Sequence, residues 1–513
     1  MEYDKIKNVK RNIIYGFVNK IILMFCPFII RSIIIMKLSV EYVGLSSLFS
    51  SVLQVLSLAE LGFGTAIVYS MYKPIATNDI VTINALLNFY KKIYRIIGSI
   101  ILVCGICIFP FIQNFISGEI PPNINIKILY VIYLFNTVIS YFSGAYKQSL
   151  LIAHQRNDVE NNIISVASII MYLLQIIVLT LFRNYYMYII LLPISTVFIN
   201  VSRNFLIKKM YPEYYCNGKI ENSLKKDMYK RVFGLALTRI CQVCRNSFDS
   251  IIISSFLGLA VLGKYQNYYY IMNTIIGFLS IVTSSVVAGI GNSIVTKTID
   301  ENYLEFKNFS FIYNWIATWC TVCLLCLYQP FMNLWLGKEF MFPFELVIYM
   351  CIYFYGLKVG DIVSVYKEAT GIYWEDKIRP IIESIVNLIL NIVLVKSFGV
   401  YGVVMSTIFS IVFINIPWSA CILFKIYFKK NVKEYFIVVL KNSIKLMVVC
   451  IITYLICGLV SFDGIIEIVI KGIICVCVPN ILIILLNYKS SNLKNNYIFI
   501  KKYIENRREI WKK

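Results

Sequence analysis

The stretch ALTRICQVCRNSFDS, residues 236–250, places two arginines and an aspartate in a segment that is otherwise apolar enough to cross a membrane. This segment aligns without a gap on the first apolar segment of the chain. Residues 11–44 match residues 230–263, which sets Arg239 on Lys20. Two equivalent segments so far apart in one chain indicate an internal repeat.

Further matches extend the repeat over most of the chain. Gly44 falls on Gly263, and three further pairs recur in the same order about 215 to 220 residues apart: PFIQNFISGE (110–119) with PFMNLWLGKE (330–339), LLQIIV (173–178) with ILNIVL (389–394), and STVFINV (195–201) with SIVFINI (410–416). Each repeat holds an even number of apolar segments, so both halves enter the membrane in the same direction. Parallel duplicated halves favour a transporter with its site at the seam.

Composition identifies the class of protein. Of 513 residues, 59% are hydrophobic and only 15% charged, which is typical of an integral membrane protein. Apolar stretches of about 20 residues, the length that spans a bilayer, recur about fourteen times: 12–36, 42–71, 94–116, 127–150, 160–182, 185–206, 231–257, 261–295, 307–328, 343–366, 379–396, 399–424, 435–460 and 464–487. The predicted fold is all-α, with two parallel six-helix repeats and two C-terminal helices.

The expected organisation is a six-helix lobe over residues 1–207, a cytoplasmic linker over 208–230, a second lobe over 231–428, and helices 13 and 14 with a basic tail over 429–513. The basic start of the chain runs into an apolar segment too long for the core of a signal peptide, so we expect the first helix to remain attached. The segment 79–92 is expected to be an amphipathic cytoplasmic segment.

The basic residues behind the net charge of +22 indicate how the chain is oriented in the membrane. Most of the 49 Lys and Arg residues fall in the N-terminal tail, alternate loops and the C-terminal tail, whereas each loop on the opposite side has one: Lys37, Lys127, Arg183, Lys264, Lys338, Lys396 and Lys471. The positive-inside rule then predicts that both termini lie in the cytoplasm and that the basic segments contact anionic lipids. The abundance of Ile, Asn, Lys and Tyr suits an AT-rich bacterial genome, so we expect a bacterial inner-membrane protein. Nucleic-acid binding is not needed to explain the charge.

The fifteen cysteines include three CxxC pairs, at 104–107, 241–244 and 320–323. All three lie in apolar segments, so we interpret them as small packing residues and expect no metal site. The single histidine, His154, is expected to be a solvated loop residue. No outer loop is long enough for a catalytic domain, so we expect neither catalytic residues nor an enzyme.

Charged side chains inside predicted spans are the candidate functional residues, because each costs about 2.5 to 3.5 kcal/mol if it faces lipid. Helical spacing groups them on faces. The first helix carries Lys20, Met24, Pro27 and Arg31 on one face, and the seventh carries Arg239, Gln242, Asn246 and Asp249, with Arg245 beside them.

Two readings of these charges stay open. Lys358 with Asp361, and Arg245 with Asp249, have the spacing of ion pairs within a helix. Lys20, Arg31 and Arg239 have no acidic residue three or four places away, so we predict that they bind a ligand, although pairing across helices or snorkelling is the alternative. Arginine suits a phosphate ligand because its fork binds two oxygens. Glu60 and Glu383 are further acidic residues of the predicted spans, and either could pair with another charge.

Two longer stretches carry a resemblance to a known family: EYVGLSSLFSSVLQVLSLAELGFGTAIVYSMYKPIATND (41–79) and DSIIISSFLGLAVLGKYQNYYYIMNTI (249–275). With the basic tail and the two lobes, the chain resembles the polysaccharide-transport branch of the multidrug/oligosaccharidyl-lipid/polysaccharide exporter superfamily. The resemblance implies a flippase for undecaprenyl-pyrophosphate-linked oligosaccharide repeat units of O-antigen, capsule or exopolysaccharide, with helices 1, 2, 7 and 8 lining its cavity. It also implies the polysaccharide polymerase and chain-length machinery as partners.

The predicted site is therefore Lys20, Arg31, Arg239, Gln242, Arg245 and Asn246 for the substrate, with Glu60, Asp249, Lys358 and Asp361 for coupling or ion pairing. No cofactor is expected, and H⁺, Na⁺ or the membrane potential would supply energy. Drug-exporting relatives use acidic residues within the membrane, so a cation-coupled multidrug exporter is the alternative. A membrane scaffold or polymerase without transport activity is a third hypothesis.

Overall fold

The apolar segments form helices because a backbone surrounded by lipid must satisfy its hydrogen bonds internally. The computed structural model describes residues 2–57, 63–122, 124–372, 374–460, 462–490 and 493, and none of these residues lies in a strand. The side chains of some helical residues, Arg239 and Gln242 among them, lie outside this description. The predicted all-α membrane fold is confirmed.

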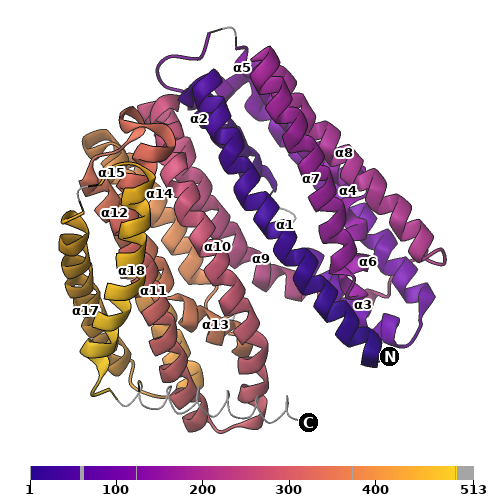
Figure 1. The fold of residues 1–513 in the computed structure, drawn as a ribbon. Helices are drawn as coiled ribbons and strands as arrows, with labels where there is room; N and C mark the ends of the chain where they lie inside the picture. The colour runs from indigo at the N-terminus through magenta and orange to yellow at the C-terminus, as the bar shows by residue number, and fades with distance from the viewer. Residues whose placement is uncertain are drawn as a thin grey trace. The chain divides into compact units, whose positions relative to one another are not determined.

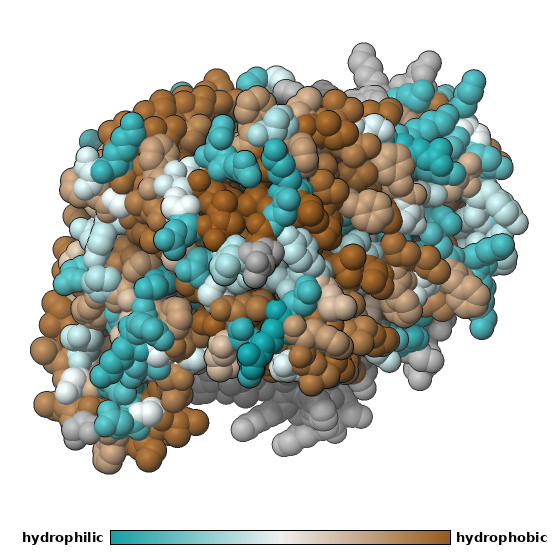
Figure 2. Space-filling view, turned by 90° about the horizontal axis from the view of Figure 1, so that it is seen from above, coloured by the Kyte–Doolittle hydropathy of each residue, from teal (hydrophilic) through white to brown (hydrophobic). Residues whose placement is uncertain are grey.

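Eleven helices in the described part of the chain are long and apolar enough to cross a membrane, or twelve if Ile126–Phe142 and Ala145–Ala153, bent by 50°, form one span. Every predicted segment falls on one α-helix or on two consecutive α-helices, in some cases with a short 3-10 or π-helical segment between or beside them. Large apolar side chains are exposed along these helices, and Figure 2 shows hydrophobic side chains over much of the surface seen from above. Such a surface suits contact with lipid tails.

The chain divides into two compact units, Met1–Gln266 and Asn267–Lys513. The elements of the first unit are α1 (Glu2–Lys37), α2 (Val40–Leu56), α3 (Phe63–Ala76), α4 (Ile80–Ile108), η2 (Phe109–Phe115), α5 (Ile126–Phe142), η3 (Ala145–Lys147), α6 (Gln148–Ala153), α7 (Asn157–Ile177), η4 (Val178–Phe182), α8 (Tyr185–Met210), α9 (Asn222–Leu257) and the start of α10 (Leu259–Thr296) (Figure 1). In this unit α1 packs along α7, and α9 packs against α2 and α3.

The second unit holds the rest of α10, then α11 (Ile299–Leu336), η5 (Lys338–Phe340), α12 (Phe344–Val359), α13 (Asp361–Thr370), α14 (Ile378–Phe398), α15 (Val400–Phe409), η6 (Ser410–Asn415), α16 (Ile416–Leu423), η7 (Phe424–Phe428), α17 (Lys433–Gly458) and α18 (Ile465–Asn487). The last two helices pack against each other and against α11. The predicted lobe boundary at 208–230 stays a prediction.

Polar residues fix where several helices begin. Asp79 caps α4 by accepting a hydrogen bond from the backbone nitrogen of Thr82 (3.0 Å), and the hydrogen bonds from Thr82 lower the pKa of this carboxyl. From this cap α4 continues unbroken to Ile108. The residues 79–92, expected to be amphipathic and cytoplasmic, therefore comprise the cap and the first turns of the long helix α4, and their cytoplasmic location stays a prediction.

Two glycines confirm the register of the repeat. A Cβ atom built on Gly44 in α2 would overlap the carbonyl oxygen of Leu259, and one built on Gly263 in α10 would overlap that of Val40. The two contacts are reciprocal, because Val40 and Leu259 each lie four residues before the glycine of their own helix. The absent side chains let α2 and α10 approach backbone to backbone at this crossing.

Buried ion pairs join helices within each unit. In the first, Arg203 of α8 binds Glu160 of α7 (2.6 Å) and also donates to Asn200, with Arg203 and Glu160 each 5% exposed or less. In the second, Asp376 accepts from Lys367 (2.5 Å) and Arg379 (2.8 Å). Charges that are paired and hydrogen-bonded in this way hold the helices in one arrangement.

Candidate functional site

Helix α1 carries the first two predicted cations at different depths. Lys20 is exposed and follows Asn19, which is buried against α7 and hydrogen-bonds Asn161 (3.3 Å) and Ser165 (3.2 Å). Arg31 is half-buried. With a helical rise of about 1.5 Å per residue, the two cations lie about 16 Å apart along the axis, which spreads the positive charge over three turns.

Arg31 lies next to two other helices of the first unit. Its Nη1 atom donates to the backbone oxygen of Gln266 on α10 (3.3 Å), and Nε2 of Gln266 donates to the hydroxyl of Ser250 on α9 (2.8 Å). Gln266 therefore links the cationic face of α1 to the polar face of α9. The sequence does not single out Gln266, because a lone glutamine in an apolar helix has no local signal.

The polar face of α9 is largely inside the protein. Arg245 is 7% exposed and Asp249 3%, while Asn246 is half-buried. Ser247 donates a long hydrogen bond to Gln54 of α2 (3.4 Å). The side chains of Arg239 and Gln242, and the whole of Glu60, lie outside the described residues. The proposed pairing of Arg245 with Asp249 stays a prediction.

The predicted charged residues of the second unit form ion pairs and hydrogen bonds with nearby side chains. Lys358, at the end of α12, binds Asp361 at the start of α13 (2.6 Å), and Asp361 also accepts from the hydroxyl of Tyr313. Glu383 accepts from Arg379 (2.7 Å) and from the amide of Asn415 (2.7 Å). These contacts give the carboxylates local partners within the unit.

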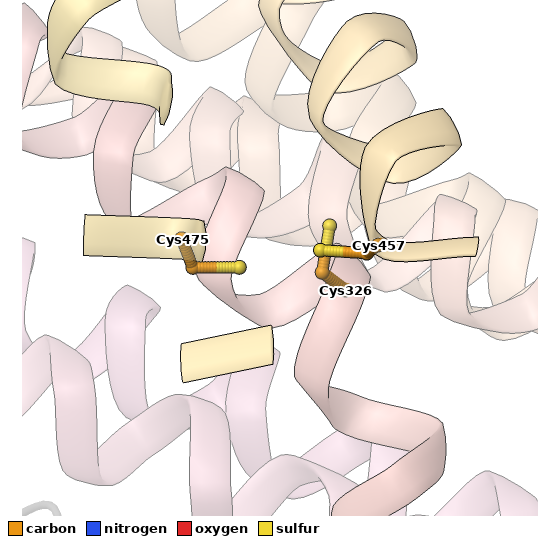
Figure 3. Close-up of side chains that lie close together, drawn as sticks. All are labelled: Cys326, Cys457 and Cys475. Atoms are coloured by element: carbon orange, nitrogen blue, oxygen red, sulfur yellow. The ribbon is translucent and has the colours of Figure 1, made fainter. Parts of the chain in front are cut away.

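Three buried cysteines from different helices lie together (Figure 3). The Sγ atoms of Cys326 (α11), Cys457 (α17) and Cys475 (α18) are all within 4.8 Å of one another. Three thiols suit a soft cation in geometry. However, Val322, Val449 and Ile483 surround them, and an apolar setting favours neutral, unreactive thiols. Packing therefore explains this cluster best.

Two expectations about single residues are wrong. Cys104 and Cys107 are exposed on the apolar surface of α4, so they do not fill the protein interior. His154 is only partly exposed, because it stacks on Tyr211 with ring centroids 4.4 Å apart and its Nε2 atom is buried. Burial lowers the pKa of this imidazole. Tyr211 and Tyr214 follow α8, so their contact with His154 is a tertiary contact that local sequence does not encode.

Charges that the sequence interpretation did not single out form two further groups. Arg203 lies in the predicted span 185–206, and its pairing with Glu160 depends on the contact between α7 and α8. Lys441 and Lys445 lie four residues apart in the span 435–460 and, with Lys307, line a cavity of about 220 Å³ in the second unit. The spacing of Lys441 and Lys445, which places both on one face of a helix, is the feature of the sequence that could have indicated this group.

No protein-family model matches the chain, and no curated protein sequence matches it significantly. Solved structures do match. The lipid II flippase MurJ in an inward closed conformation has a TM-score of 0.67 at 17% identity, over 93% of this chain and 99% of that one. An inward-facing MATE multidrug resistance transporter of the MOP superfamily has 0.59 at 13%, over 76% and 92%.

A MOP superfamily transporter from Pyrococcus furiosus, described as having a binding pocket of reverse polarity, gives 0.53 at 12% identity, over 83% of this chain and 97% of that one. The chain has the fold of these transporters. At such identities the likeness extends to the arrangement of helices and not to the residues that bind a substrate.

Proposed function

We propose that the chain is a flippase that moves undecaprenyl-pyrophosphate-linked oligosaccharide repeat units from the cytoplasmic to the outer leaflet of the bacterial inner membrane by alternating access. The pyrophosphate and the first sugars bind along the polar faces of α1 and α9, at Lys20, Arg31, Arg239, Arg245, Gln242 and Asn246. The repeat units are those of an O-antigen, a capsule or an exopolysaccharide.

The observation that carries this proposal is the half-buried guanidinium of Arg31, which is linked through Gln266 to the polar face of α9. A cation at this depth of a membrane helix is costly unless a partner or ligand compensates it. The shared fold supports the same conclusion, because the lipid II flippase matches 93% of the chain and the MATE transporter 76%.

We further propose that the membrane potential assists outward movement, since an anionic headgroup leaving an inside-negative cell gains about 2.3 kcal/mol per charge per 100 mV. H⁺ or Na⁺ binding at Asp249 or Glu60 would then reset the carrier. Transport by this route needs no cofactor. The polysaccharide polymerase and the chain-length machinery would act on the delivered repeat units.

The test is a variant in which Lys20 and Arg31 are both replaced by Ala. Each cation lost from a phosphate is worth roughly tenfold in affinity, so surface glycan should fall to the level of a deletion strain. Lipid-linked repeat units should accumulate on the cytoplasmic face, as measured by lipid extraction and glycan labelling of intact cells.

The matched control is Lys37→Ala, which removes an exposed lysine from the last turn of the same helix. It should leave surface glycan unchanged. Normal surface glycan in the double variant, with the protein present in the membrane at wild-type level, would refute the phosphate site.

The second candidate is a cation-coupled exporter of small amphipathic molecules, and Asp249, only 3% exposed in a membrane helix, favours it. Here Asp249→Asn should abolish drug resistance in a sensitised host while the Lys20 and Arg31 variant stays active. A flippase should instead lose its activity when Lys20 and Arg31 are replaced.

A further inference from the structure

The second unit contains a basic cavity that the proposed transport site does not use. It has a volume of about 220 Å³, roughly that of seven waters in the liquid, and lies among α11, α12, α17 and α18. Four lysines from three helices line it: Lys307 of α11, Lys358 of α12, and Lys441 and Lys445 of α17.

The lysines lie at different depths. Lys358 is buried at 5% exposure, Lys445 is half-buried, and Lys307 and Lys441 are exposed. The cavity is therefore lined by a buried cation and leads to two cations at the surface. Lys441 and Lys445, one helical turn apart on α17, repel each other unless an anion lies between them.

Among the described residues, the lysines that line the cavity outnumber the carboxylates beside it. Asp361 binds Lys358, and Glu434, the acidic residue lining the cavity, accepts a hydrogen bond from Tyr303 (3.2 Å). In the described part of the chain no ion pair within 4.0 Å engages Lys307, Lys441 or Lys445.

Two of these lysines contact neutral groups. Lys445 donates to the amide oxygen of Asn487 (2.6 Å), and Lys307 lies 4.7 Å above the ring of Tyr303. The lining also includes the hydroxyl of Ser310, which is buried with no hydrogen-bond partner among the described residues. Ammonium groups beside hydroxyl groups form a donor-rich cavity that suits a small oxyanion such as phosphate.

We propose that this cavity binds the phosphate headgroup of an anionic membrane lipid. The outward surface of α17 supports a lipid as the source, because Ile437, Leu440, Ile444 and Met447 are all more than half exposed beside the two lysines. Lysines and tyrosines at the level of the headgroups, followed by apolar side chains, match a phosphate attached to acyl chains. This proposal goes beyond the proposed flippase function, and it does not depend on which molecule the protein transports.

The experiment uses the purified full chain and measures bound lipid by native mass spectrometry, with phosphatidylglycerol, phosphatidylcholine and inorganic pyrophosphate as separate probes. Phosphatidylglycerol should bind, and the variant Lys441→Gln with Lys445→Gln should weaken it by at least about tenfold. Lys433→Gln, which removes an exposed lysine of α17 outside the cavity, should leave binding within about twofold.

Two further results decide the source of the phosphate and control for folding. Equal retention of both phospholipids by the wild type, or no loss in the double variant, overturns the proposal. Binding of pyrophosphate alone, with the same dependence on Lys441 and Lys445, overturns the lipid as its source. If the double variant unfolds, Lys441→Gln alone should still weaken binding, since this exposed side chain is not needed for packing, and Lys441→Arg should restore it.

Discussion

At the scale of single residues, the buried pair of Arg203 and Glu160 offers a direct test of internal charge. Replacing Arg203 by Met leaves the carboxylate of Glu160 buried without its cation, so the free energy of unfolding should fall by about 3 kcal/mol. Thermal unfolding of the purified protein in detergent measures this change.

The control is Lys297→Met, which breaks the more exposed pair between Lys297 and Glu305. A surface pair contributes about 1 kcal/mol or less, so the melting temperature should move little. Equal shifts for both variants would contradict a special role for the buried pair.

His154 predicts a pH dependence. Burial against Tyr211 and Tyr214 lowers its folded pKa below the usual 6.5, so the folded protein holds the imidazole neutral. The unfolded chain gains a proton first as the pH falls, and the stabilisation is therefore present above about pH 6.5 and lost below it. Melting temperatures between pH 7.5 and pH 5, roughly spanning that pKa, should decrease for the wild type.

His154→Phe keeps an aromatic ring against Tyr211 but cannot titrate. Its melting temperature should depend less on pH over the same range. Identical pH profiles for the wild type and this variant would show that another group causes the acid sensitivity.

At the scale of elements, the crossing of α2 and α10 depends on two glycines. Gly44→Ala and Gly263→Ala would each drive a methyl group into a backbone carbonyl of the other helix, so each should cost about 1 to 3 kcal/mol through overpacking. Because the contacts are reciprocal, the two variants should have similar effects on the melting temperature.

Gly277→Ala is the matched control, since Gly277 lies in the same helix α10 and a Cβ there meets nothing within 4 Å. This change should be neutral or slightly stabilising because alanine favours a helix. A loss as large as that of Gly263→Ala would show that the close approach of α2 and α10 is not the cause, since helix propensity alone predicts no loss.

At the scale of the whole molecule, the charge asymmetry predicts topology. A phosphatase that is active only outside the cytoplasm should be active when fused after Lys338 and inactive when fused after Lys430, because these residues lie in loops predicted on opposite sides. Activity at both positions, or the reverse pattern, would refute cytoplasmic termini. Protein levels by immunoblot provide the control.

Sequence by itself determined the membrane class, the all-α fold and the repeat, because segment length and residue periodicity are local properties of the chain. It also placed Lys20 and Arg31 on a helix that is apolar enough to cross a membrane, and Arg245 on the helix α9. Only the tertiary structure decided which charges meet. The pairing of Arg203 with Glu160, the link from Arg31 to Gln266 and the lysine cavity each join helices distant in sequence. Helix packing sets these neighbours, and an apolar helix of given composition can face many partners.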